Sequence, residues 1–290
     1  MKVLLLGATG QLGWELTRTC PADIEIHTCD HPKVDFTSTL SIRNCVNRDR
    51  FDYIINAAGY TAVDKAEAEK GLARQINAEA VELLAGLCKN SNIQLVHIST
   101  DFVFKGTHYK PYLPDDITEP QSVYGRTKLA GEKAVRRILG KDAFIIRTAW
   151  LYSVHGHNFV KTMIRLMDEK DQLTVVDDQI GTPTWAKGLA NVIWASIATC
   201  QQGINHWTDA GSASWYDFAV AIQEEALALG LLSKEIPITP VSTGDYPTPA
   251  RRPYYGILDK RDFLKKTGIR PVHWRKQLRK MLKELGGESV

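Results

Sequence analysis

The chain has 290 residues, of which 44% are hydrophobic and 24% are charged, and its formal net charge is +3. This length allows one large domain or two modest ones with a sizeable core. The small net charge gives no reason to expect binding to nucleic acid or to an anionic membrane surface, and no stretch approaches the ~20 apolar residues that span a bilayer.

Strand-like and helix-like segments alternate through the first half of the chain. Short apolar runs predict strands at residues 2–6, 24–29, 53–56, 93–98 and 143–147. Helical spacing predicts helices between them, at about 11–19, 40–47, 72–89 and 123–139. Repeated β-α-β order predicts an α/β fold, with a doubly wound parallel sheet that carries helices on both faces.

The second half is less regular. Helical spacing recurs at 158–167, 187–198, 215–229 and 274–285, and prolines cluster at 237–240 and 247–253. We expect residues 1–150 to form a Rossmann domain, onto which 185–205 pack back. Residues 151–290 should form mainly a smaller, irregular α/β domain for the substrate.

The five cysteines are odd in number and form no Cys-x-x-Cys pair. This pattern favours a reduced, cytoplasmic interior over a disulfide framework or a zinc site. The apolar start of the chain is too short for a signal peptide and ends at Gly7, so a buried strand is expected there.

A glycine-rich loop follows the first predicted strand and opens a helix, which is the context of a dinucleotide-binding fingerprint. Gly7 permits a tight turn, Gly10 lets the backbone approach a pyrophosphate, and Gly13 allows close packing of helix on sheet. The main-chain N–H groups at the helix start, including those of Gln11 and Leu12, then face the phosphates. The alternative is a structural turn without a ligand.

Residues after the next two predicted strands complete the expected cofactor site. Asp30 ends the second strand, where a carboxylate binds the adenosine ribose and disfavours the 2′-phosphate of NADPH. His31 and Lys33 could offset that repulsion, so NADPH and NADH both stay open, and a merely turn-forming Asp30 is the alternative. The remaining positions that should line the adenine or let the backbone lie close to the nucleotide are Asp35, Phe36, Ala57, Ala58 and Gly59.

Tyr124 and Lys128 are four residues apart, so a helix places them on one face. A phenol with an ordinary pKa of about 10 is a poor acid–base group at neutral pH, and a nearby ammonium lowers that pKa. The lysine can also hold the nicotinamide ribose. Thr100 follows the fourth predicted strand, at the sheet edge where ligands bind. The three side chains can converge on one carbonyl oxygen, unless Tyr124 is a surface residue beside an unrelated threonine.

Seven stretches along most of the chain resemble the dTDP-4-dehydrorhamnose reductase family of extended short-chain dehydrogenases/reductases. They are residues 7–16, 56–67, 99–104, 124–132, 147–152, 178–184 and 246–253. The resemblance implies NAD(P)H-dependent reduction of the C4 ketone of dTDP-4-dehydro-L-rhamnose to dTDP-L-rhamnose, a precursor for bacterial surface polysaccharide. Tyr124 would donate the proton, Lys128 would lower the Tyr124 pKa, and Thr100 would hydrogen-bond the carbonyl oxygen.

The resemblance also implies residues that bind the nucleotide sugar. Asp101 and Trp150 match substrate-binding positions, although Trp150 could instead be a core residue. Arg252 is expected at the nucleotide diphosphate, because a guanidinium suits phosphate.

One departure from the family concerns metal. Some members look like magnesium-linked dimers with glutamates at three positions, and Glu15 and Glu284 match two of them. Lys187 stands at the third, where its ammonium would repel a cation. We therefore predict no bound metal, and any homodimer should form by another route.

Other functions stay open. Another extended short-chain nucleotide-sugar enzyme, such as a 4-epimerase or a different 4-ketoreductase, would need the same residues. The resemblance also extends to the regulatory β subunit of methionine adenosyltransferase, a non-catalytic protein of the same fold, but the presence of Thr100, Tyr124 and Lys128 argues against that function.

Overall fold

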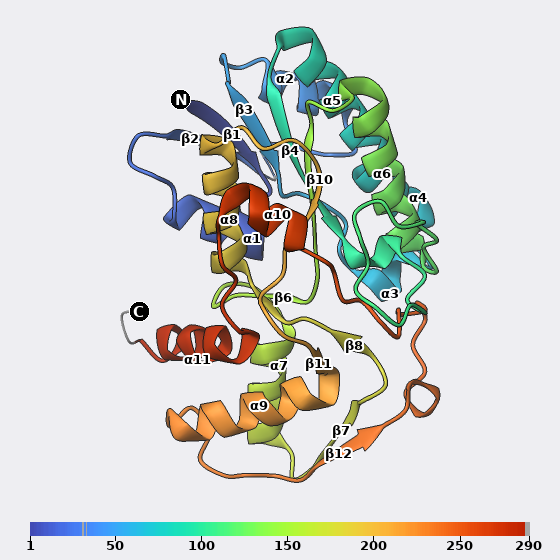
Figure 1. Ribbon diagram of the computed structural model, residues 1–290, viewed down its shortest axis with the longest axis vertical. Helices are drawn as coiled ribbons and strands as arrows, with labels where there is room; N and C mark the ends of the chain where they lie inside the picture. Colours follow the sequence, from blue (N-terminus) through green and yellow to red (C-terminus); the bar gives the residue numbers. More distant parts are fainter. Residues whose placement is uncertain (31, 33, 288–290) are drawn as a thin grey trace.

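In the part of the chain that the computed structural model describes, residues 1–30, 32 and 34–287, six strands form one parallel sheet (Figure 1). The strand order is β10-β5-β4-β3-β1-β2, and every neighbouring pair is parallel. The strands are β1 Lys2–Leu6, β2 Glu25–Cys29, β3 Tyr53–Asn56, β4 Gln94–Thr100, β5 Phe144–Thr148 and β10 Gly203–His206. The predicted parallel sheet is confirmed. β10 was missed because its four residues include only one large apolar side chain.

Helices cover both faces of this sheet, and they are α1 Gln11–Arg18, α2 Thr39–Val46, α5 Ala80–Ser91, α6 Val123–Leu139 and α8 Ala186–Ala198. α1 packs against α8, whereas α5 packs against α2 and α6. Val3 and Leu5 belong to the apolar cluster on the α8 face, and Leu4 and Leu6 belong to the cluster on the α5 face. Because side chains alternate along a strand, β1 is buried by both helical layers.

The helix predicted at 72–89 is interrupted. The structure has α3 Val63–Ala66, α4 Lys70–Arg74 and a π-helical turn, Gln75–Glu79, before α5. The Asn77 side chain in this turn accepts from the Tyr60 N–H at 2.8 Å and donates to the Tyr60 carbonyl at 3.0 Å. These contacts depend on tertiary packing, so helical periodicity alone did not predict the interruption.

The second half of the chain builds a smaller, irregular α/β part below the sheet in the view of Figure 1. Three helices and two short parallel strands enclose its apolar cluster: α7 Phe159–Glu169, α9 Trp215–Ala228, α11 Trp274–Leu285, β7 Leu173–Val176 and β12 Ile238–Val241. The shorter elements of the fold are η2 Asp101–Val103, β6 Leu151–Tyr152, β8 Ile180–Gly181, β9 Thr184–Trp185, β11 Ala213–Ser214, η3 Thr243–Asp245 and α10 Arg261–Thr267. Sequence sets the helix starts, since the side chains of Asn158 and Ser214 cap α7 and α9.

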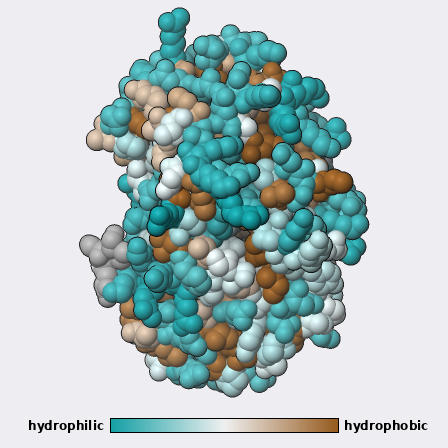
Figure 2. All heavy atoms as spheres, viewed as in Figure 1, coloured by the Kyte–Doolittle hydropathy of each residue, from teal (hydrophilic) through white to brown (hydrophobic). Residues whose placement is uncertain are grey.

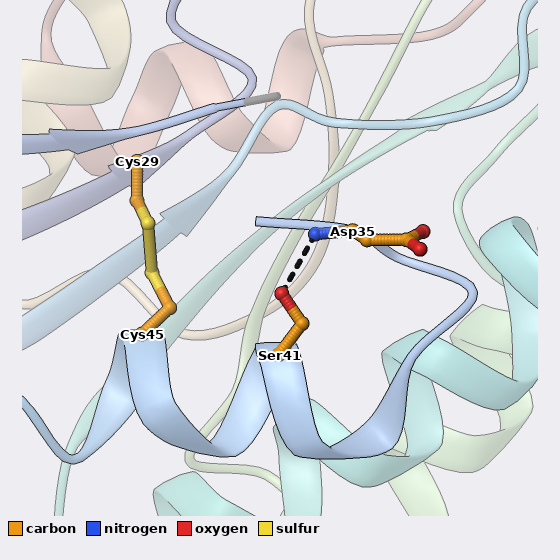
Figure 3. Close-up of a disulfide and its surroundings, with 4 residues drawn as sticks. All are labelled: Cys29, Asp35, Ser41 and Cys45. Atoms are coloured by element: carbon orange, nitrogen blue, oxygen red, sulfur yellow. Dashed lines mark hydrogen bonds between the residues drawn. A yellow bond between two sulfur atoms is a disulfide. The ribbon is translucent and has the colours of Figure 1, made fainter. Parts of the chain in front are cut away.

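Cys29, at the end of β2, and Cys45, in α2, form a disulfide (Figure 3). The expectation of a chain without disulfides is therefore wrong for this pair. The two residues are 16 positions apart and both side chains are buried, so the packing of α2 against the end of β2 brings them together. No sequence motif marks that proximity.

Figure 2 shows a face on which hydrophilic residues predominate and hydrophobic residues lie in small separate groups. Within the described ranges, no helix has the length and apolar character needed to cross a membrane.

Candidate active site

The glycine loop between β1 and α1 is shaped by two tightly packed glycines. Gly7 has a φ of +84°, and a Cβ added to it would lie 2.5 Å from the main-chain nitrogen of Ala58. A Cβ on Gly13 would lie 2.0 Å from the carbonyl oxygen of Gly7. Both positions therefore require glycine, one against the end of β3 and the other where α1 meets the loop.

Gly10 differs from Gly7 and Gly13, because the protein leaves room for a Cβ at this position. Its backbone is exposed, and an added Cβ would only reach 3.4 Å from the carbonyl oxygen of Gly7. Gly10 precedes α1 without a side-chain cap, and within the described residues no hydrogen bond is found for the N–H groups of Gln11, Leu12 and Gly13. Unpaired N–H groups at a helix start bind anions. The loop thus fits the pyrophosphate of a dinucleotide.

Asp30 holds this loop, because its carboxylate accepts a hydrogen bond from the Thr9 N–H at 2.5 Å. The Asp35 carboxylate accepts from both the N–H and the hydroxyl of Thr37, at 2.8 and 2.7 Å. Phe36 is half-buried and packs against the cluster on the α5 face. His31 and Lys33, expected to offset the charge of Asp30, lie outside the described residues.

Thr100, Tyr124 and Lys128 come together at the carboxyl end of β4. The Thr100 hydroxyl lies close enough to the Tyr124 hydroxyl to lower the Tyr124 pKa, and it donates to Asp101 at 3.0 Å. Lys128 lies one turn further along α6, and its ammonium donates to the carbonyl oxygen of Ile98 at 2.6 Å. A Cβ added to Gly59 would lie 3.9 Å from the Lys128 ammonium, whereas Ala57 and Ala58 lie against Gly7 in the glycine loop.

The start of α6 is placed by two features of its sequence. The Ser122 side chain caps the helix by accepting from the Gly125 N–H at 3.1 Å. A Cβ on Gly125 would lie 2.2 Å from the carbonyl oxygen of Phe102, so only glycine lets the helix approach the end of β4 this closely. Tyr124 is thereby brought next to Thr100.

Burial governs the electrostatics of this group. Burial raises the pKa of Tyr124 to about 12, the nearby Thr100 hydroxyl lowers this pKa, and the charge of Asp101 raises it. Burial also lowers the pKa of Lys128 to about 8, although the negative charge of Glu132 acts to raise it. The expectation that Lys128 lowers the Tyr124 pKa is therefore wrong for this structure, in which desolvation has the largest effect and Lys128 is not among the groups that shift this pKa. The phenol stays protonated at neutral pH.

The carboxyl ends of β3, β4 and β5 also carry buried polar atoms without a partner among the described residues. They are Asn56 Oδ1, Ser99 Oγ, Asp101 Oδ2 and Thr148 Oγ1. Burial raises the pKa of Asp101 to about 7. Unpaired buried polar atoms are uncommon, and their concentration at this edge indicates a site for a polar ligand.

Trp150 lies where the chain leaves the sheet for the second half. Its backbone has a φ of +49°, its ring stacks on Trp215 with centroids 3.5 Å apart, and a Cβ on Gly181 would lie 2.3 Å from that ring. The half-buried ring is thus fixed between two elements of the second half. Backbone strain of this kind is common at binding sites.

A pocket of about 310 Å³ lies beside these rings, lined by Trp215, Gln179, Tyr246 and Arg252 among others. Arg252 already makes a two-point contact with Asp64, at 3.1 and 2.7 Å, which lowers the Asp64 pKa. Gln179 and Tyr246 fall in stretches that carry the family resemblance, although sequence reasoning did not single them out. Nothing in the sequence pointed to Trp215.

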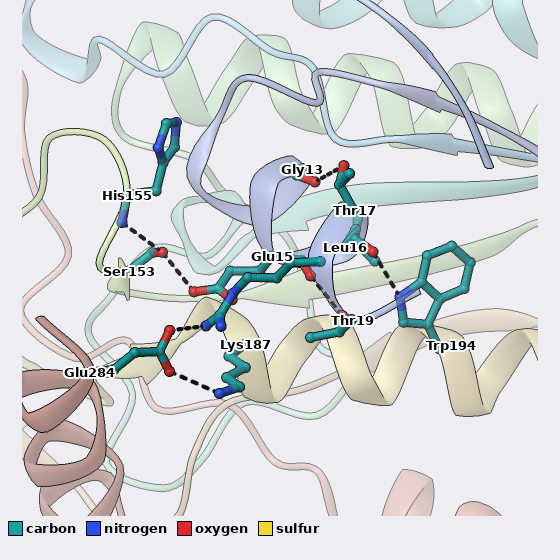
Figure 4. Close-up of polar contacts among 11 residues, drawn as sticks. Gly13, Glu15, Leu16, Thr17, Thr19, Ser153, His155, Lys187, Trp194 and Glu284 are labelled. Atoms are coloured by element: carbon teal, nitrogen blue, oxygen red, sulfur yellow. Dashed lines mark hydrogen bonds and ion pairs between the residues drawn. The ribbon is translucent and has the colours of Figure 1, made fainter. Parts of the chain in front are cut away.

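The glutamates considered for magnesium are engaged by cations of the chain (Figure 4). Arg18 contacts Glu15 and Glu284, each at 2.5 Å, and Lys187 donates to Glu284 at 2.8 Å. Glu15 also accepts from the Ser153 hydroxyl at 2.7 Å. Across the described ranges, no group of three or more His, Cys, Asp or Glu residues is arranged to hold a metal ion.

Comparisons with known proteins agree along the whole chain. A family model described as the RmlD substrate binding domain matches residues 1–286. The dTDP-4-dehydrorhamnose reductase of Escherichia coli K12 is 39% identical over 98% of each chain, and the dTDP-4-keto-6-deoxy-D-glucose reductase of Streptomyces niveus is 38% identical over 93% of each. The solved dTDP-4-dehydrorhamnose reductase of Bacillus anthracis, in complex with NADP, has a TM-score of 0.92 at 36% identity over 98% of this chain and 99% of that one. The chain belongs to the dTDP-4-dehydrorhamnose reductase family.

Proposed function

We propose that this protein reduces the C4 ketone of dTDP-4-dehydro-L-rhamnose to dTDP-L-rhamnose with NADPH or NADH. Family membership supports the substrate class. The observation that carries the chemistry is the placement of Thr100 beside Tyr124 at the carboxyl end of β4, with Lys128 one turn away on α6.

The glycine loop would hold the cofactor, with the free N–H groups of Gln11, Leu12 and Gly13 at the pyrophosphate. Asp30 would bind the adenosine ribose on the far side of the loop. When bound, the reduced nicotinamide supplies the hydride.

The side chains of the protein supply the proton. The hydroxyls of Thr100 and Tyr124 hydrogen-bond the substrate carbonyl oxygen, where negative charge develops. Tyr124 then gives its proton to that oxygen. The Lys128 ammonium, one turn away on α6, would stabilise the phenolate that remains, since opposite charges attract more strongly in a buried site than in water.

The pocket next to Trp215 and Arg252 would receive the nucleotide part of the substrate. Arg252 is held by Asp64 and so needs little reordering to meet a diphosphate. Trp150, stacked on Trp215, would line the path from this pocket to Asp101 and Thr100. A contact chain supports that path, because Ile180 beside Gly181 accepts from the Gly256 N–H, and Gly256 packs on Asp101.

A cytoplasmic location and a metal-independent mechanism are part of the proposal. The free thiols of Cys20, Cys88 and Cys200 are compatible with a reducing compartment, whereas the Cys29–Cys45 disulfide is unusual there. Any homodimer would assemble without magnesium, because Arg18 and Lys187 already neutralise Glu284.

The test is reduction of the keto sugar by the purified protein, with each cofactor in turn. We expect NAD(P)H consumption to equal the amount of dTDP-L-rhamnose formed. A 4-epimerase would return an epimer without net oxidation of cofactor. Absence of turnover with every dTDP-4-keto sugar, together with a stable protein partner, would instead favour the regulatory function.

A second candidate is reduction of a different dTDP-4-keto sugar, which the name of the Streptomyces niveus relative favours. The same Thr100 and Tyr124 chemistry would serve it. Competition between dTDP-4-dehydro-L-rhamnose and dTDP-4-keto-6-deoxy-D-glucose for the protein separates the two by their kcat/KM values.

A further inference from the structure

Thr9, in the glycine loop, has both of its main-chain polar groups engaged by side chains from elsewhere. Its N–H donates to Asp30, and its carbonyl oxygen accepts from His155 Nε2 at 2.9 Å. Since a carbonyl oxygen only accepts, this bond selects the form of His155 that carries a proton on Nε2. Thr9 directly precedes Gly10, which enters α1 without a side-chain cap. The two bonds therefore set the direction of the peptide that leads into the helix.

His155 is itself held firmly. Its ring stacks on Trp14 in α1, with centroids 5.3 Å apart and planes 6° from parallel, and the Arg18 guanidinium lies 4.6 Å from the centre of the same Trp14 ring. The His155 N–H donates to the Ser153 hydroxyl at 3.1 Å, and that hydroxyl donates to buried Glu15 (Figure 4). The main chain and the ring of His155 are thus both anchored to α1.

The loop of residues 153–158, between β6 and α7, makes a second contact with the start of α1. The Asn158 amide donates to the Gln11 side-chain oxygen at 3.1 Å. Gly156 has a φ of +74°, and a Cβ added there would lie 3.2 Å from Gln11 Cγ. This loop from the second half is therefore fitted to the residues that should face the cofactor phosphates.

We propose that His155 is a positioning residue for the cofactor, which holds the glycine loop through Thr9 in the conformation that receives the dinucleotide. The proposal rests on the proposed function, since it takes the glycine loop as the cofactor site. His155 acts on cofactor affinity and leaves the proton transfer at Tyr124 unchanged.

The test measures the Kd of NADPH, by its fluorescence on binding, for the full-length protein and four variants. His155→Ala and His155→Phe both lack the donor, and the second keeps a ring on Trp14. His155→Gln keeps a donor without the ring. His157→Ala is the matched control, because His157 lies in the same loop with an exposed side chain.

We expect the Kd of NADPH to rise about fivefold in the Ala and Phe variants, which is the usual effect of one lost hydrogen bond. His155→Gln should recover part of that loss, and His157→Ala should bind as the unmodified protein does. The KM for cofactor should rise in parallel with Kd, while kcat and the KM for the keto sugar stay unchanged.

Equal NADPH affinity of His155→Ala and the unmodified protein would overturn the proposal. A fall in kcat and in thermal stability, together with a rise in both KM values, would also overturn it, because that pattern marks a purely structural residue. If the unmodified protein binds neither NADPH nor NADH, the proposed function itself fails. If it binds NADPH and His155→Ala binds equally well, only the proposal for His155 fails.

Discussion

The ammonium of Lys128 donates to the carbonyl oxygen of Ile98 at 2.6 Å, and this bond joins the helix that carries Tyr124 to the strand that carries Thr100. Both groups are buried, so the bond is not shared with water. The end of β4 and the beginning of α6 are held together by the residue that would stabilise the Tyr124 phenolate.

This placement predicts an alkaline limit to activity. Burial lowers the pKa of Lys128 to about 8, and the ammonium is present below that pKa and lost above it. We expect kcat/KM to fall as the pH rises through about 8. In Lys128→Arg the cation persists at every accessible pH, so the remaining activity should not show this decline. An identical alkaline limb in both proteins, measured as initial rates against pH, would assign the titration to another group.

Gly10 and Gly13 should respond differently to the same substitution. Gly10→Ala leaves the fold intact, because the protein has room for the methyl group, but it should weaken NADPH binding about tenfold by crowding the phosphates. Gly13→Ala should lower thermal stability, because its Cβ would overlap the Gly7 carbonyl.

Gly86→Ala, in α5, is the control for both variants, since nothing lies within 4 Å of its added Cβ. It should keep cofactor affinity, and it should gain stability because alanine favours helix. Unchanged NADPH affinity in Gly10→Ala would show that the phosphates lie elsewhere.

Magnesium should have no effect on the protein. Arg18 and Lys187 occupy the carboxylates of Glu15 and Glu284, and an added cation would have to displace them. We expect the same rate and the same sedimentation coefficient in EDTA and in millimolar Mg²⁺. A dimer that appears only with Mg²⁺, or Mg²⁺ bound to either glutamate, would contradict this expectation.

The disulfide predicts a definite thiol count. Protein that is denatured without reductant should show three thiols, those of Cys20, Cys88 and Cys200, and five after reduction. Cys45→Ala opens the cross-link across a separation of 16 residues and should cost about 3 kcal/mol of unfolding free energy. Cys200→Ala, at an exposed thiol, should cost far less. Five thiols without reductant would show that the pair is reduced.

The sequence predicted the sheet because its strands are short apolar runs between helical segments, as strands buried on both faces are. It predicted Thr100, Tyr124 and Lys128 because two local rules, helical spacing and the end of a strand, place them together. The pKa of Tyr124 is raised, whereas the spacing to Lys128 predicted that it would be lowered. Burial causes the difference, and it is a tertiary property that this spacing does not reveal.

Other features could not be predicted because they join segments far apart in the chain. The stacking of Trp150 on Trp215 depends on two-residue strands too short for a periodic pattern. The contact between His155 and Thr9 spans 146 positions, and neither residue belongs to a recognisable motif with the other. Contacts of this kind follow from how the second half packs on the sheet.

Replacement of the Tyr124 hydroxyl tests the central claim most directly. Tyr124→Phe should lower kcat for the keto sugar by about 10²–10⁴-fold, the usual contribution of a positioned proton donor, with the Kd of NADPH nearly unchanged. Tyr109→Phe is the control, since that side chain is 87% exposed. A Tyr124→Phe protein that turns over dTDP-4-dehydro-L-rhamnose at the rate of the Tyr109→Phe control would contradict the account.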